Sequence, residues 1–400
     1  MSAAAGKTKP RLLTWLVASA AALGLLLLVL SVTVDDGKGG GPDVTAGDAW
    51  QRLAPPPASP ASSFASGSGS ASASASGEIV LATAAGRLLA VTGSEVRTFE
   101  DGGVGDGAGR WSQPVPIPGP ARSGATIVGT PEALIVWGGR AGAGLRHDGY
   151  AYVPGETAWQ ALPTSPLSAR QGARGVWTGR EVVILGGGVD STHTQVETAA
   201  YDPAHRTWRR LGDAEGLDGA AVMATAWTGD QVVVWGYHED TADDDMLAVD
   251  PDADLPVWST VASPPFPPTA GGSGLAGDPV GLVATATSIR PARAAVLPWR
   301  APLGTVSRWR PLSSPPVPPD VLCSSELQHA GAGTVLLSEC SDALFLLDPD
   351  GSPTWRRLPP PEPGAPDAGP GQALVTDDAV YYLVPGTSGT APSLLRLELP

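Results

Sequence analysis

From residue 77 onward, short apolar runs alternate with turn-forming residues, a pattern typical of β-strands rather than helices. Residues 175–187, GVWTGREVVILGG, hold two runs of branched and aromatic residues around a Thr-Gly-Arg-Glu turn and predict a β-hairpin. Residues 125–139 and 222–235 repeat the pattern. An apolar residue with Asp-Pro then ends a third strand, and a Trp begins a fourth. The pattern therefore predicts repeated units of four strands.

Tryptophans mark the period of this repeat. They stand at six positions separated by 46 to 51 residues: Trp111, Trp159, Trp208, Trp258, Trp309 and Trp355. The resulting units span residues 77–112, 122–162, 170–211, 219–261, 272–312 and 323–358. Four strands in such a unit match one blade of a β-propeller, whose small sheets pack against their neighbours around an axis. The sequence therefore predicts an all-β propeller over residues 77–400.

The two ends of the repeat are incomplete in complementary ways. Residues 371–399 supply three strands without a Trp strand, whereas Trp50-Gln51-Arg52-Leu53 is a Trp strand alone. We expect residues 49–53 to be the outer strand of the last blade, because closing the ring removes an exposed sheet edge. Six complete units and one unit formed by the two ends predict seven blades. Residues 54–76, rich in Pro and then in Ala, Ser and Gly, are expected to form a flexible linker that does not pack.

Three phrases of the repeat resemble the kelch family of propellers, of which galactose oxidase is a type. They are a Gly-Gly doublet after the second strand (Gly138-Gly139 and Gly186-Gly187), Tyr201-Asp202-Pro203 after the third, and Trp at the start of the fourth. The resemblance is best over residues 122–260. A sharp turn with positive φ explains glycine at the doublet. The copper site of galactose-oxidase-like enzymes is not expected, because the chain's two cysteines lie together in one predicted hairpin.

The N-terminus predicts a membrane anchor. Residues 12–34 are 23 positions without a charge, enough for a helix to cross a hydrocarbon core of roughly 30 Å. Lys7, Lys9 and Arg11 precede this run, so residues 1–11 are expected in the cytoplasm and the rest of the chain outside the cell membrane. A cleaved signal peptide is the alternative, disfavoured by the length of the run. Residues 35–48 are expected to be a linker to the propeller.

Charge and composition narrow the function. The chain has 51 Gly and 41 Pro among 400 residues, which disfavours a helical fold. It holds 25 Lys and Arg against 40 Asp and Glu. Three of the basic residues and none of the acidic ones lie in the first 34 positions, so the remainder carries 22 − 40 = −18. Such a surface repels phosphate backbones, so a nucleic-acid partner is not expected.

The two cysteines are predicted to pair. Cys323 and Cys340 flank a hairpin that turns at residues 330–333. In a symmetric hairpin here, opposite residues have numbers that sum to 663, as 323 and 340 do. A cross-strand disulfide is therefore expected, consistent with an oxidising compartment outside the cytoplasm. Two unrelated buried thiols are the alternative.

Candidate ligand-binding residues lie in the predicted loops between second and third strands. These loops project from one face of a propeller and carry His147, Asp190, His193, His238, Glu239 and Asp240. They are candidates for a polar ligand, and no bound metal or cofactor is predicted. Trp137 and Trp235 end second strands, whereas Trp177 and Trp227 end first strands. Repetition at one blade position predicts that all four pack between sheets rather than bind sugars.

No catalytic motif emerges from the sequence. The function expected is that of a single-pass, monomeric envelope protein whose propeller binds a protein or glycan partner. The alternative is a glycan-acting hydrolase or lyase outside the cytoplasm, with acids such as Asp190, Glu239 and Asp240 at the mouth of the propeller. A sensor or assembly factor acting with other membrane proteins is a lesser option.

Overall fold

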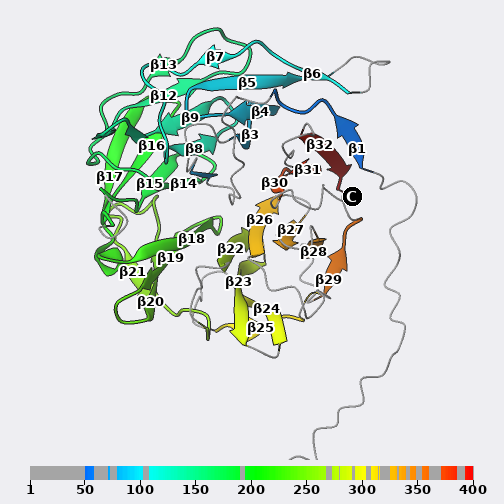
Figure 1. Ribbon diagram of the computed structural model, residues 1–400. Helices are drawn as coiled ribbons and strands as arrows, with labels where there is room; N and C mark the ends of the chain where they lie inside the picture. The colour runs from blue at the N-terminus through cyan, green and yellow to red at the C-terminus, as the bar shows by residue number, and fades with distance from the viewer. Residues whose placement is uncertain are drawn as a thin grey trace, which may run out of the picture. The chain divides into compact units, whose positions relative to one another are not determined.

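The computed structural model is a seven-bladed β-propeller (Figure 1). The structure describes residues 50–57, 71–72, 79–101, 108–189, 194–266, 273–278, 280–290, 293–302, 308–313, 315, 325–330, 333–338, 343–347, 354–359, 371–384 and 392–399. All of them belong to the compact unit Val44–Pro400. Within these residues the single helical element is the short 3-10 turn η1 (Glu215–Leu217). The all-β, seven-bladed prediction is confirmed.

Each blade is a sheet whose four main strands pair antiparallel in the order first, second, third, fourth from the axis outward. Blades 1 to 4 are β3 (Val80–Ala84), β4 (Arg87–Val91), β5 (Glu95–Glu100), β6 (Arg110–Trp111); β8 (Thr126–Gly129), β9 (Leu134–Trp137), β12 (Gly149–Tyr152), β13 (Gln160–Ala161); β14 (Arg174–Trp177), β15 (Val182–Leu185), β16 (Glu197–Asp202), β17 (Thr207–Asp213); and β18 (Ala221–Trp227), β19 (Val232–His238), β20 (Asp243–Val249), β21 (Ser259–Val261). Blades 5 to 7 are β22 (Ser273–Asp278), β23 (Gly281–Arg290), β24 (Arg293–Pro302), β25 (Arg310–Pro311); β26 (Ser325–Ala330), β27 (Gly333–Ser338), β28 (Ala343–Leu347), β29 (Trp355–Arg357); and β30 (Gln372–Val375), β31 (Ala379–Val384), β32 (Ser393–Glu398), β1 (Gln51–Leu53).

Three short additions accompany these sheets. β7 (Val115–Pro116) pairs with β5, and a hairpin of β10 (Arg140–Ala141) and β11 (Gly144–Leu145) lies between β9 and β12. The third addition is β2 (Ala71–Ser72), which pairs with β8 on the axial side of blade 2. Within the linker expected at residues 54–76, Ala71–Ser72 is therefore paired, whereas residues 58–70 and 73–76 lie outside the described residues.

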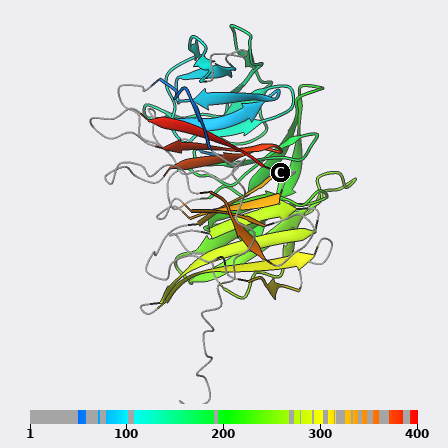
Figure 2. The same cartoon turned by 90° about the vertical axis from the view of Figure 1, so that its right-hand side faces the viewer.

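The first strands form a closed ring. Each lies beside the first strand of the next blade, in the order β3, β8, β14, β18, β22, β26, β30 and back to β3. Figure 2 shows the last blade (red) lying between the first blade (blue to cyan) and the sixth (orange). The second strands are nearly continuous apolar runs, such as Val182–Leu185, and are buried on both faces. The core therefore consists of apolar clusters between neighbouring blades.

The ring closes through β1, as the sequence predicts. β1 pairs antiparallel with β32, with Arg52 opposite Leu395 and Leu53 opposite Leu394. Leu53 is buried between the last and first blades in a cluster that includes Leu81 and Leu394. The N-terminal strand thus completes the seventh blade and covers the edge of β32.

The fourth-strand tryptophans join neighbouring blades by a repeated hydrogen bond. In five blades the indole N–H donates to the carbonyl four residues after the preceding Trp of the ring: Trp50 to Pro359, Trp111 to Ala54, Trp159 to Val115, Trp208 to Pro163 and Trp309 to Ala262. In blade 4, Trp258 donates to the Thr198 hydroxyl, which itself donates to the Gly212 carbonyl at that same spacing. The periodic tryptophans are therefore structural links between blades.

Two buried arginines explain the Gly-Gly doublets. Arg122 and Arg170 are almost fully buried and precede the first strands of blades 2 and 3. Each donates to the carbonyl of the first doublet glycine, Gly138 at 3.2 Å or Gly186 at 3.1 Å. All four doublet glycines have φ between 63° and 89°, as the turn argument predicts.

Blade 4 lacks both the buried arginine and the Gly-Gly doublet. Gly236-Tyr237 stands at the position of the doublet, and the residues before β18 that lie beside it are buried Leu217 and Ala220 rather than an arginine. A Cβ on Gly236 would lie 2.8 Å from Leu217, so an apolar contact takes over the joint.

Electrostatics at Arg170 follow from its burial. Burial lowers the pKa of its guanidinium to about 10, and the carboxylate of Glu197 acts in the opposite direction. The pKa of Glu197 is lowered, because hydrogen bonds from Ser168 and the charge of Arg170 outweigh the effect of burial. The pair holds the start of β16 against the end of β15.

Several predicted features lie outside the described residues. No helix among the described residues is long and apolar enough to cross a membrane, and the predicted span at 12–34 is not among those residues. Cys323 and Cys340 are also outside them. The hairpin beside the cysteines has the predicted symmetry, since Ser325 pairs with Ser338 and Ala330 with Gly333, each pair summing to 663.

Candidate functional site

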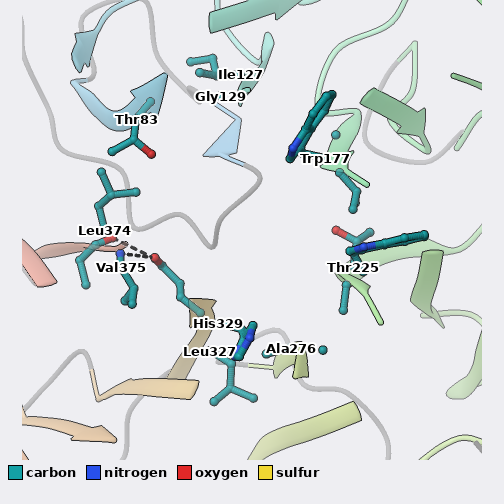
Figure 3. Close-up of a pocket in the computed structure, with 18 of the residues that line it drawn as sticks. Thr83, Ile127, Gly129, Trp177, Thr225, Ala276, Leu327, His329, Leu374 and Val375 are labelled. Atoms are coloured by element: carbon teal, nitrogen blue, oxygen red, sulfur yellow. Dashed lines mark hydrogen bonds between the residues drawn. The ribbon is translucent and has the colours of Figure 1, made fainter. Parts of the chain in front are cut away.

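A cavity of about 340 Å³ lies at the axis, where the first strands of all seven blades meet. Figure 3 shows side chains arranged around it, with Trp177 and Thr225 on one side and Thr83, Leu374 and Val375 on the other. Its walls come from the seven first strands and are mostly small or apolar, with no Asp, Glu, Lys or Arg among the described lining residues. We refer to this space as the channel.

One position of the blade repeat supplies the side chains that line the channel near the turns between first and second strands. It is the residue two places before the turn that joins the first and second strands, and in chain order it is Thr83, Gly129, Trp177, Trp227, Gly277, His329 and Val375. The following Thr often closes the turn, as in Thr178, whose hydroxyl accepts from the Glu181 N–H and donates to the Glu181 carbonyl. The rigid turn therefore fixes where each of the seven side chains lies.

Small residues in this ring allow the strands to approach. A Cβ on Gly129 would lie 1.7 Å from the Thr83 carbonyl oxygen, and one on Gly277 would lie 1.9 Å from the Trp227 carbonyl oxygen. Three of the other five places hold the large residues Trp177, Trp227 and His329, and the remaining two hold Thr83 and Val375. The ring is thus narrow at its glycines and has aromatic side chains at three other positions.

Trp177 and Trp227 differ from the other repeated tryptophans. Trp137 and Trp235 are buried between sheets, as the sequence predicts. Trp177 and Trp227 pack against apolar core clusters, as the sequence predicts, but they are only partly buried and also line the channel. The described part of the chain supplies no hydrogen-bond partner for either indole N–H, whereas the fourth-strand residues Trp50, Trp111, Trp159, Trp208 and Trp309 each have one.

The channel opens into a wider cavity of about 850 Å³ on the face formed by the turns between first and second strands. The two spaces share Thr83, Gly129, Trp177, His329 and Val375. We call the wider cavity the mouth.

Charged side chains line the mouth, next to the aromatic residues of the channel. Asp101, Asp377, Asp378 and Arg396 line it. The Arg396 guanidinium lies 3.2 Å from an oxygen of Asp378, which also accepts a hydrogen bond from Thr376. The mouth therefore combines aromatic surface, hydroxyl groups, an imidazole and charges of both signs.

Side chains satisfy part of the backbone that faces the channel. Gln328 of blade 6 donates to the Ala373 carbonyl and accepts from the Val375 N–H of blade 7, both at 2.9 Å (Figure 3). Gln372 of blade 7 accepts from the Leu81 N–H of blade 1 at 3.0 Å. A first strand is the inner edge of its sheet, so these bonds replace the strand partner that the edge lacks.

The sequence-predicted candidates lie elsewhere. His147 is exposed before β12, while Glu239 and Asp240 are exposed beyond β19, on the face opposite the mouth. His238 is partly buried, with Nε2 3.0 Å from Asp245 and 3.3 Å from the Gly216 carbonyl. Asp190 and His193 are outside the described residues. Among those that are described, no three His, Cys, Asp or Glu side chains are grouped to hold a metal.

Sequence reasoning missed the channel ring for an identifiable reason. It searched the loops between second and third strands, whereas the ring residues lie within first strands. A usable signal was present: second strands repeat Val, Ile and Leu, but the ring position varies from Gly to Trp and His. Such variation at one strand position indicates a surface that the core does not constrain.

Comparison with known proteins adds a likeness of fold. No protein-family model matches the chain, and no curated protein matches it. The chain is similar to a solved structure titled "Structure of YjhT", with 12% sequence identity over 79% of this chain and 96% of that one, and a TM-score of 0.46.

Proposed function

We propose that this protein is a glycan-binding module whose site is the mouth of the channel. One observation carries the proposal: Trp177 and Trp227 line the channel with partly exposed rings, and the described residues supply no hydrogen-bond partner for either indole N–H. The apolar face of a sugar ring stacks on indole, and its hydroxyls accept from indole N–H groups. Thr83, His329 and the charged groups of the mouth supply further hydrogen bonds to hydroxyls.

Of the acids assigned to the enzyme alternative, the two that the structure describes lie away from the proposed site. The enzyme alternative assigned catalysis to Asp190, Glu239 and Asp240, and neither Glu239 nor Asp240 lines the channel or the mouth. Asp378, which does line the mouth, is paired with Arg396. A retaining or inverting glycosidase needs two carboxyl groups roughly 5 to 10 Å apart across the substrate.

We further propose that the propeller is of the kelch type and is held outside the cell membrane by residues 12–34. The Gly-Gly doublets with their positive φ and the Tyr-Asp-Pro phrases support the first point. The uncharged run and the three preceding basic residues support the second. A disulfide between Cys323 and Cys340 belongs to the same proposal, because the register of β26 and β27 leads to that pair.

A glycan array tests this function with the full-length protein in mild detergent. We expect binding to at least one class of glycan, reduced at least tenfold when Trp177 and Trp227 are both replaced by Ala. Trp208→Phe is the control, because Trp208 is a fourth-strand residue whose N–H already donates to Pro163. Binding that survives the double substitution, or no binding to any glycan, would refute the proposal.

A further inference from the structure

The channel has a wall on every side. The first strands that line it form a closed ring, in which each strand lies beside the next and β30 lies beside β3. A Cβ on Gly129 would overlap the Thr83 carbonyl oxygen, so these neighbouring strands leave no space for a sugar to pass between them. Because a closed ring has no side entrance, a polymer reaches the interior only by passing an end of its chain along the axis.

The size of the channel suits a single chain and not a chain that doubles back. Its volume of about 340 Å³ is at the lower end of the roughly 300 to 1,000 Å³ found for small-molecule pockets. Its lining in blade 1 runs from Val80 to Thr83, three steps of about 3.3 Å, so the channel is roughly 10 Å long. An internal stretch of a glycan would have to enter with two lengths of chain side by side, and this volume leaves no space for the second.

The two tryptophans of the proposed site do not both face the mouth. Trp177 lines the channel and the mouth, whereas Trp227 lines the channel alone. A glycan lying across the mouth would therefore reach Trp177 but not Trp227. Contact with both indoles requires a sugar residue inside the channel, and that residue has to be the end of its chain.

The channel and the mouth differ in charge. The described residues that line the channel include no Asp, Glu, Lys or Arg, while the hydroxyl-bearing Thr83 and Thr225 lie on opposite sides of it (Figure 3). A carboxylate or ammonium group that entered the channel would lose its hydration without gaining an opposite charge, which is costly. The mouth, in contrast, holds charges of both signs, such as Asp101 and Arg396.

We infer that the channel takes the uncharged end residue of a glycan chain against Trp177 and Trp227, while the mouth meets the residues that follow. This inference rests on the proposed function and specifies its substrate class. It separates the chain end, which has to be neutral, from the rest of the chain, which is free to carry charge.

Glycans with blocked ends test the inference on the full-length protein. The probe is a linear glycan of the class that the array identifies, long enough for its middle to stay clear of caps, with streptavidin bound through biotin at one end, the other end or both. We expect two caps to weaken binding at least tenfold and at least one singly capped chain to bind as the free chain does. Binding that two caps leave unchanged would overturn the inference, and so would loss of binding with either single cap.

Charge at the end residue gives a second readout. The same chain is compared when its entering end is a hexose and when it is the corresponding hexuronic acid. We expect the acid to bind at least tenfold more weakly at pH 7, and equal binding would overturn the requirement for an uncharged end. Thr225→Lys places an ammonium group in the channel wall and should remove most of this difference.

Thr260→Lys is the matched control, because Thr260 is an exposed residue of the outer strand β21 in the same blade. It adds the same charge away from the channel and should leave the preference for the hexose unchanged. If the two lysine variants behave alike, the charge of the channel wall does not explain the preference. No binding to any free glycan would refute the proposed function itself, whereas binding that is indifferent to caps would refute this inference alone.

Discussion

Replacing Arg170 with Met tests the joint that holds blade 3 together. The guanidinium is fully buried and donates to the Gly186 and Glu197 carbonyls at 3.1 Å, to the Ser168 hydroxyl at 2.8 Å and to a Glu197 carboxylate oxygen at 2.5 Å. Met has a similar length but donates no hydrogen bond. The two carbonyls then lose a donor, and the carboxylate loses its buried counter-charge.

The cost can be estimated from these contacts. A buried polar group left without its partner costs about 1 to 3 kcal/mol, and breaking a buried ion pair costs about 3 to 5 kcal/mol. Because the Glu197 side chain is 26% exposed and keeps its bonds from Ser168, we take the lower part of this range, about 3 kcal/mol. For a unit of roughly 350 residues the unfolding entropy is about 0.7 kcal/mol/K, so the thermal midpoint falls by about 4 °C.

Differential scanning calorimetry of the full-length protein checks this value. Arg180→Met is the control: Arg180 lies in the same blade, is 64% exposed and pairs with Asp252 at the surface. An exposed ion pair of this kind contributes at most about 1 kcal/mol, so its midpoint should move by no more than about 1 °C. If Arg170→Met and Arg180→Met behave alike, the assignment of Arg170 as a structural joint is wrong.

Three further predictions follow from the same geometry. Glu197 has a lowered pKa in the folded state, so its ionised carboxylate stabilises the fold. This contribution to stability is complete above the unfolded pKa near 4.5 and is lost as the pH falls through the lower folded pKa. The difference in thermal midpoint between wild type and Glu197→Gln should therefore be full at pH 7 and vanish in strong acid. Leu53→Ala should cost about 2 to 4 kcal/mol in a denaturant titration, because Leu53 is 5% exposed in the cluster that closes the ring, and an unchanged midpoint would show that β1 does not hold the ends together. Mass spectrometry of a non-reduced digest should find Cys323 linked to Cys340, and two free thiols in protein isolated without reductant would refute the pairing.

The sequence predicts the fold well because the repeat carries redundant information. The Trp spacing, the hairpin turns and the Asp-Pro phrases all point to four-stranded units, and the remainder at each end predicts that Trp50 and Leu53 complete the last blade. β1 pairs with β32 in that way. The reason for the Trp spacing appears only in three dimensions, where in five blades the indole donates to the carbonyl four residues after the previous Trp of the ring.

The candidate site is less accessible from the sequence. Trp177 and Trp137 look alike in the repeat, since each ends a strand of a hairpin. Trp137 lies at the end of a second strand, enclosed by neighbouring sheets, whereas Trp177 lies at the end of a first strand, where it packs on the core and also faces the channel. Strand position relative to the axis decides between packing and exposure, and periodicity alone does not reveal it.

The strand formed by residues 71–72 has a similar explanation. Ala and Ser in alternation carry no hydrophobic signal, so the tract reads as a linker. The pairing with β8 therefore has no counterpart in the pattern of the sequence.

The indole N–H signals of the full-length protein test the central claim most directly. With isotope-labelled tryptophan the chain gives one signal for each of its 13 Trp residues, and Trp177→Phe and Trp227→Phe identify two of them. On titration with a glycan found by the array, we predict that these two signals shift at saturation while those of Trp208 and Trp309 stay in place. A bound glycan that shifts the signals of Trp208 and Trp309 and leaves those of Trp177 and Trp227 unmoved would contradict a binding site at the channel mouth.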